Sequence, residues 1–130
     1  MIKIDFSLLI AYCMIIYWLS AQTFLPAPQW FEHQDKLHHA TAYAVMAFWT
    51  WRAFRHLTAR PVILAFVSLI FCSLYGISDE WHQSFVLGRE SDAADWLADT
   101  LGAALMISVL YKRRFFVAKK ETIHASTQFS

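Results

Sequence analysis

The sequence FSLLIAYCMIIYWLSAQTFL, from Phe6 to Leu25, runs for 20 residues without a charged side chain. A helix of that length spans about 30 Å, which matches the hydrocarbon core of a bilayer. A secretory signal peptide would also begin a chain with an apolar run. Here Lys3 is offset by Asp5 ahead of the run, and no clean small-residue cleavage site follows it. We therefore expect a retained membrane helix.

Three further apolar runs follow, namely Leu37 to Phe54, Val62 to Ser78 and Asp95 to Tyr111. The first of these three is the weakest, because it opens on His38 and His39. Hydrophobic residues make up 58% of the chain, whereas soluble domains contain about 45–50%. Three Gly and three Pro are too few for a turn-rich β architecture. The sequence therefore predicts an all-α, membrane-spanning bundle of four transmembrane helices.

The domain organisation expected from these runs is simple. Residues 1–117 form a single transmembrane domain, and residues 118–130 form a polar cytoplasmic tail that we expect to be disordered. Between the third and fourth runs, the stretch from Trp81 to Ser91 is charged and aromatic, so we expect an interfacial or re-entrant segment there.

The basic residues predict the orientation. With four spans, one side of the membrane holds nine of the eleven, and the other side holds only Lys36 and Arg89. The nine are Lys3, Arg52, Arg55, Arg60, Lys112, Arg113, Arg114, Lys119 and Lys120. Because basic residues are retained on the cytoplasmic side, we expect a multi-pass protein of the cell membrane with both termini cytoplasmic. A net charge of +1 gives no reason to expect a nucleic-acid partner.

Charged residues gather in the stretch from Gly76 to Gly102, which holds six carboxylates, one His and one Arg. Ionisable residues in membrane segments are costly and usually mark a working site. The predicted topology brings this stretch to the outer face with the start of the second run, so three polar clusters should meet there. The candidate ligand-binding residues are Asp35, Lys36, His39, Tyr43, Asp79, Glu80, Gln83, Arg89, Asp95 and Asp99.

Several of these residues suggest a particular chemistry. Arg89 is the best anion-binding candidate, because its guanidinium forks onto phosphate or carboxylate. His39 with Asp79 or Glu80 could act as a general acid and base, so these three are the catalytic candidates. Asp99 lies about a turn inside its apolar run, where an unpaired carboxylate is costly. We expect it to be protonated, paired with Lys36, Arg89 or His39, or in contact with a water-filled cleft.

Metal binding is a separate question. Clustered carboxylates could serve a hard cation, and a His with carboxylates would suit a transition metal. The chain lacks the zinc-protease spacing H-E-x-x-H and other standard metal motifs. We therefore predict no metal and no cofactor, with a cation at the acidic cluster as the open alternative. Gly102, close behind Asp99, should let another helix approach closely.

Taken in order, these residues resemble the motifs of the VanZ-like family, small integral membrane proteins related to the teicoplanin-resistance protein VanZ. The matching residues are Asp35-Lys36-x-x-His39-x-x-x-Tyr43, Asp79-Glu80-x-x-Gln83-x-Phe85-x-x-Gly88-Arg89 and Asp95-x-x-x-Asp99-x-x-Gly102. The resemblance covers roughly Ser20 to Gly102, and residues 1–117 would form the VanZ-like domain. The chain departs from the family at Leu87, where Pro is usual, at Asp99, where Asn is usual, and at Met106, where a small residue is usual.

The resemblance implies a multi-helix membrane protein of the bacterial inner membrane and supplies no mechanism. We expect the outer site to bind or handle an anionic envelope lipid or a lipid-linked cell-wall precursor, with a link to glycopeptide resistance open. Arg89 and Lys36 would then contact the phosphate. Two alternatives stay open. One is an enzyme acting on a lipid headgroup through His39 and a carboxylate. The other is a small proton- or ion-coupled transporter subunit using Asp95 and Asp99, which would require a homo-oligomer.

Overall fold

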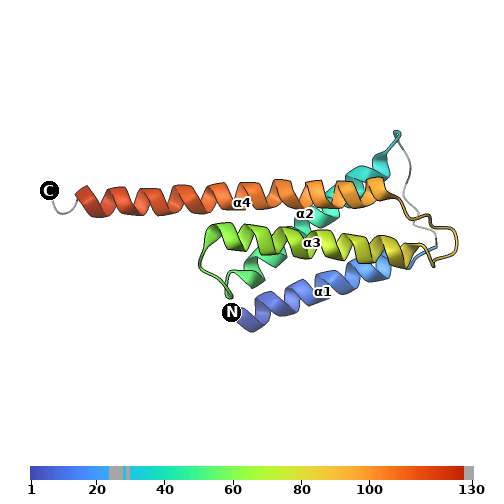
Figure 1. Cartoon of the computed structure of the whole chain (residues 1–130), viewed down its shortest axis with the longest axis horizontal. Coiled ribbons are helices and arrows are strands. Elements are labelled where there is room, and N and C mark those ends of the chain that lie inside the picture. The colour runs from blue at the N-terminus through green and yellow to red at the C-terminus, as the bar shows by residue number, and fades with distance from the viewer. Residues whose placement is uncertain (24–27, 29, 128–130) are drawn as a thin grey trace.

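The computed structural model describes residues 1–23, 28 and 30–127, with side chains up to residue 118. It contains four helices: α1 (Ile2–Ser20), α2 (Gln34–Phe54), α3 (Pro61–Gln83) and α4 (Ala93–Thr127), arranged as a bundle (Figure 1). The prediction of an all-α fold is confirmed. By length and composition, α1, α3 and the Ala93–Ala118 part of α4 could each cross a membrane.

The start of α3 follows from proline chemistry. Pro61 is the first residue of the helix, where its missing N–H has no hydrogen bond to lose. Arg60 before it is extended, as a residue before proline prefers. The helix then continues past the predicted end at Ser78 to Gln83. Asp79 and Glu80 are therefore on a helix, although the sequence placed them at its end.

Two other boundaries also differ from the prediction. Helix α1 ends at Ser20, whereas the apolar run extends to Leu25, and residues 24–27 lie outside the described part of the chain. At the other end of the chain α4 stays helical to Thr127, where a disordered tail from residue 118 was predicted. The end of the apolar run therefore does not mark the end of the helix in either case, because α1 stops within its run and α4 continues past its own through polar residues.

The segment between α3 and α4 is a turn. Trp81 belongs to the last turn of α3, and residues 84–88 form consecutive turns in which Gly88 has a φ of 81°. A glycine is suited to that left-handed conformation. The prediction of an interfacial or re-entrant segment from Trp81 to Ser91 is therefore not confirmed, since no separate helix lies between α3 and α4 in this described part of the chain.

Helix α2 lies at the centre of the bundle. It contacts each of the other three helices, most extensively α4. Its buried side chains form the core together with residues of α1, α3 and α4, and this core includes Ile16, Tyr43, Met46, Trp51, Leu64, Cys72 and Ile107. Because one face of α2 is buried against its neighbours, α2 can carry on that face polar residues such as Thr50 that a helix surrounded by lipid could not. The polar residues lower the hydropathy of α2, and α2, unlike the other three helices, is not apolar enough to count as a membrane span by composition.

The two ends of the bundle have different chemistry. The N-terminus and the α2–α3 turn lie at one end, which we call the basic end, and α4 extends past it (Figure 1). There the buried Asp5 of α1 accepts a 2.7 Å hydrogen bond from Arg52 and lies 2.8 Å from Nε2 of His56. This contact ties α1 to the C-terminal end of α2. The sequence analysis did not anticipate it, because Asp5 and Arg52 are remote in the chain.

Gly102 confirms the expected close approach of two helices. A Cβ built on it would lie 2.0 Å from the carbonyl oxygen of Ala40 in α2. Since the obstructing atom belongs to the backbone, only a shift of a whole helix could relieve the clash. The α2–α4 crossing is thus set by the absence of a side chain at residue 102.

We predict that Gly102→Ala destabilises the protein by about 3 kcal/mol or more, because overpacking against a helix backbone cannot relax cheaply. The measurement is the thermal unfolding midpoint in detergent. Leu105→Ala, on the exposed face of the same helix, should change it little. An unfolding midpoint for Gly102→Ala equal to that of the wild type would contradict the tight crossing.

Candidate functional site

The candidate site lies at the end opposite the basic end, which we call the polar end. It is formed by the last turn of α1, the first turns of α2 and α4, the last turns of α3 and the α3–α4 turn. All ten candidate residues are there: Asp35, Lys36, His39 and Tyr43 on α2, Asp79, Glu80 and Gln83 on α3, Arg89 in the turn, and Asp95 and Asp99 on α4. The three clusters seen in the sequence therefore meet in space.

Lys36 joins α2 to the start of α4. Its Nζ lies 2.6 Å from carboxylate oxygens of both Asp92 and Asp95, and 3.0 Å from Asp35. The hydrogen bond from Lys36 holds the pKa of Asp92 below its usual value. Asp92 was not among the predicted site residues, although it also caps α4 by accepting the N–H of Ala94. With three carboxylates around it, Lys36 has its donors engaged.

His39 and Asp99 form the second contact between these helices. Nδ1 of His39 lies 2.9 Å from Oδ1 of Asp99, and its Nε2 lies 3.7 Å from Asp95. Of the pairings left open for Asp99, the structure therefore selects His39. Asp99 is fully buried. Gly76 of α3 makes room for it, because a Cβ there would lie 3.1 Å from Oδ2 of Asp99.

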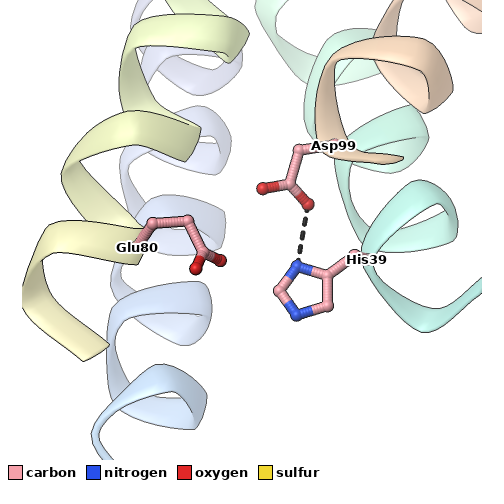
Figure 2. Close-up of side chains that lie close together, drawn as sticks. All are labelled: His39, Glu80 and Asp99. Carbon is pink, nitrogen blue, oxygen red and sulfur yellow. Dashed lines mark hydrogen bonds and ion pairs between the residues drawn. The ribbon is translucent and has the colours of Figure 1, made fainter. Parts of the chain in front are cut away.

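Glu80 brings α3 to the same place. Its side chain extends toward the His39–Asp99 pair (Figure 2), and it is only 5% exposed. One carboxylate oxygen accepts the backbone N–H of Asp92 at 2.8 Å. The donor atoms of His39, Glu80 and Asp99 all lie within 4.8 Å of one another. Three helices thus each supply one ionisable group to one small volume.

A polar cavity of about 160 Å³ opens beside this group. Its polar lining comes from Ser20, Asp35, His38, His39, Tyr43, Asp79, Gln83 and Arg89, and its apolar lining comes from Ile16, Leu19 and Ala42. Three buried groups around it, namely Ser20 Oγ, Tyr43 OH and Arg89 Nε, have no hydrogen-bond partner in the described part of the chain. Ser20 and His38 were missed as site residues, since neither stands out from ordinary helix-end residues in the sequence.

An apolar groove runs between α1 and α3. It has a volume of about 700 Å³ and is lined by Phe6, Leu9, Ile10, Cys13, Met14, Tyr17, Trp18, Phe54, Phe71 and Tyr75. A hollow of about 380 Å³ adjoins it, sharing Tyr17 and Tyr75 with the groove and Asp79 with the polar cavity. The hollow therefore borders both the apolar groove and the polar cavity.

These features define a helical protein of the membrane class with a polar pocket at one end of its bundle. A family model described as VanZ/LLP1 matches residues 8–117, so the chain belongs to the VanZ/LLP1 family. The match is broader than the stretch from Ser20 to Gly102 on which the resemblance was based. Comparison with curated proteins and with solved structures gave no match.

We predict that Lys36→Gln destabilises the protein by about 1–2 kcal/mol, a value reduced from that of a buried pair because the Lys36 side chain is 25% exposed. The loss arises because Asp92 and Asp95 would face each other without their shared cation. Thermal unfolding in detergent measures it, with Lys112→Gln, an exposed lysine remote from the polar end, as control. If combining Lys36→Gln with Asp95→Asn gave simply additive losses, the two side chains would not be coupled.

Proposed function

We propose that this VanZ/LLP1-family protein binds the phosphate-bearing headgroup of an anionic envelope lipid, or of a lipid-linked cell-wall precursor, at its polar end. One observation carries the proposal: a polar cavity with buried, unpartnered donors and an apolar groove lie on either side of a hollow that shares lining residues with both. A lipid has the same division into a polar head and an apolar chain. A water-soluble ligand would not occupy the apolar groove.

Arg89 is the residue that we expect to contact the phosphate. One of its terminal nitrogens donates to the carbonyl oxygen of Leu19 at 3.3 Å, and its Nε has no partner in the described residues. A guanidinium with unused donors suits two oxygens of one phosphate. Lys36, the other predicted phosphate ligand, is instead surrounded by three carboxylates, so we now assign it to holding the site together.

Other groups would complete the headgroup site. The hydroxyls of Ser20 and Tyr43 are buried and can donate to phosphate oxygens. Burying a hydroxyl without a partner is unfavourable, so a ligand that accepts from both gains from their arrangement. The acyl chain would then lie along the groove between α1 and α3, against side chains such as Tyr17 and Phe71.

The distribution of basic residues supports the orientation. Within the proposal α2 is the fourth span, both termini are cytoplasmic, and the polar end faces the outer leaflet. Phosphate headgroups of outer-leaflet lipids lie at that depth. Should the bound lipid be the wall precursor, its sequestration would provide a route to glycopeptide resistance.

We predict that phosphatidylglycerol and undecaprenyl phosphate raise the unfolding midpoint of the detergent-purified protein by several degrees, since a ligand of the folded state stabilises it. Arg89→Ala should remove most of this shift. The matched control is Arg113→Ala, which changes the same residue type at an exposed position remote from the polar end. Phosphatidylcholine, whose phosphate charge is neutralised, should stabilise less. Equal stabilisation of Arg89→Ala and Arg113→Ala would overturn the proposal.

A second candidate function is headgroup chemistry by an acid–base mechanism, and the 2.9 Å contact of His39 with Asp99 favours it. A buried carboxylate that orients an imidazole is the usual support for a general base. The predicted result is headgroup release from one of these lipids, detected by mass spectrometry, that is lost in His39→Ala and kept in Arg55→Ala, which alters the basic end. Turnover that survives His39→Ala, or no turnover on any lipid, would count against catalysis.

A further inference from the structure

The group formed by His39, Glu80 and Asp99 has more buried acceptors than the protein satisfies. Oε1 of Glu80 and Oδ2 of Asp99 are buried and have no hydrogen-bond partner in the described part of the chain. The second oxygen of each is engaged, on the N–H of Asp92 and on His39 respectively. An ionised oxygen buried without a partner costs several kcal/mol. A bound group that contacts these two oxygens would remove this cost.

The cations of the polar end do not neutralise these two buried oxygens, because the carboxylates there outnumber the cations. Apart from Glu32 and Glu90, which are exposed, six carboxylates lie at the polar end, against two permanent cations, Lys36 and Arg89. The six are Asp35, Asp79, Glu80, Asp92, Asp95 and Asp99. Six minus two leaves four uncompensated charges, or three when His39 is protonated. Lys36 contacts three of the six, and Glu80 and Asp99 are not among them.

The positions of the donor atoms suit a metal ion. Each of the three residues offers one ligand atom, these atoms lie within 4.8 Å of one another, and each residue comes from a different helix (Figure 2). Ligand atoms on a tetrahedral ion at about 2.1 Å are about 3.4 Å apart. The ligand atoms would therefore have to move slightly closer together to bind one ion. A small rotation of the Glu80 side chain could bring its Oε1 closer without breaking a hydrogen bond of that oxygen, because Oε1 has no partner in the described residues.

The surroundings of His39 suit the same role. A histidine that binds a metal through one nitrogen usually gives its other N–H to a carboxylate. With Nδ1 of His39 beside Asp99, its Nε2 lies 3.7 Å from Asp95. Asp95 is in turn fixed by Lys36 at 2.6 Å. A carboxylate held by Lys36 thus lies beside the ring nitrogen that would not bind the metal.

We infer that His39, Glu80 and Asp99 form a binding site for a divalent transition-metal cation such as Zn²⁺ or Mn²⁺. One imidazole nitrogen and two carboxylate oxygens favour these ions over Ca²⁺ or Mg²⁺, which prefer all-oxygen sites. Three protein ligands leave a coordination position open, as in sites that bind water or substrate. Of the three ligands, His39 also lines the polar cavity. The site does not depend on lipid binding.

The test uses the full chain in detergent, stripped with EDTA and titrated without lipid. Isothermal titration with Zn²⁺ and, separately, Mn²⁺ should give one saturable equivalent, and the unfolding midpoint should rise with metal. Glu80→Gln and Asp99→Asn keep the side-chain shape and should each weaken binding at least tenfold. Glu90→Gln makes the same change at an exposed carboxylate nearby and should bind as the wild type does.

A direct readout guards against loss by misfolding. Glu80→Cys, loaded with Co²⁺, should show a sulfur-to-metal charge-transfer band that Co²⁺-loaded wild type lacks. Absence of saturable binding by both ions would overturn the proposal. Equal weakening by Glu80→Gln and Glu90→Gln, or binding unchanged in both Glu80→Gln and Asp99→Asn, would do the same. Because no lipid is present, these failures leave the lipid-stabilisation experiment with Arg89→Ala unaffected.

Discussion

The close approach of α2 and α4 is the constraint on which the polar end depends. With no side chain at Gly102, the helix backbones meet at Ala40, a distance that a single methyl group would prevent. One turn toward the polar end, the same approach brings Asp99 to His39, and a further turn brings Asp95 to Lys36. Widening this crossing would separate both ion pairs at once. A packing requirement near the core therefore governs the electrostatics of the site.

The polar end shows how a membrane helix bundle can hold many charges. Burial removes water from Asp99, Glu80 and Asp95, and each is approached by a group from another helix. The helix richest in these polar groups, α2, contacts all three of its neighbours, as α3 also does, and it packs most extensively against α4. Its residues would be costly against lipid, and within the bundle they find partners instead. The low hydropathy of α2 is thus compatible with its central place.

Asp99 is one of three positions at which the resemblance to the VanZ-like motifs leads us to expect another residue, in this case Asn. An amide there could still bond to a histidine, but it would carry no charge. The carboxylate adds a negative charge at a fully buried position, and Gly76 leaves the space for its second oxygen. This residue bears on the two kinds of ligand proposed for the polar end, a cation and a phosphate. If a cation or a proton resides there, Asp99 is the group that holds it, whereas Arg89 across the cavity is the group that suits a phosphate.

The sequence by itself determined the helical class and the close approach at Gly102, because apolar runs and small residues act locally. It predicted four spans, of which three are long and apolar enough to cross a membrane. It also predicted the gathering of carboxylates at one end. It also selected His39 as one of the partners open to Asp99. The sequence did not show which of Lys36, Arg89 and His39 pairs with Asp99, and it did not identify Asp92 and Ser20 as site residues. Those outcomes depend on the angle and register at which α2 meets α3 and α4. Only the tertiary structure decided them, because a contact between residues 60 positions apart is set by how whole helices pack and not by the spacing along either one.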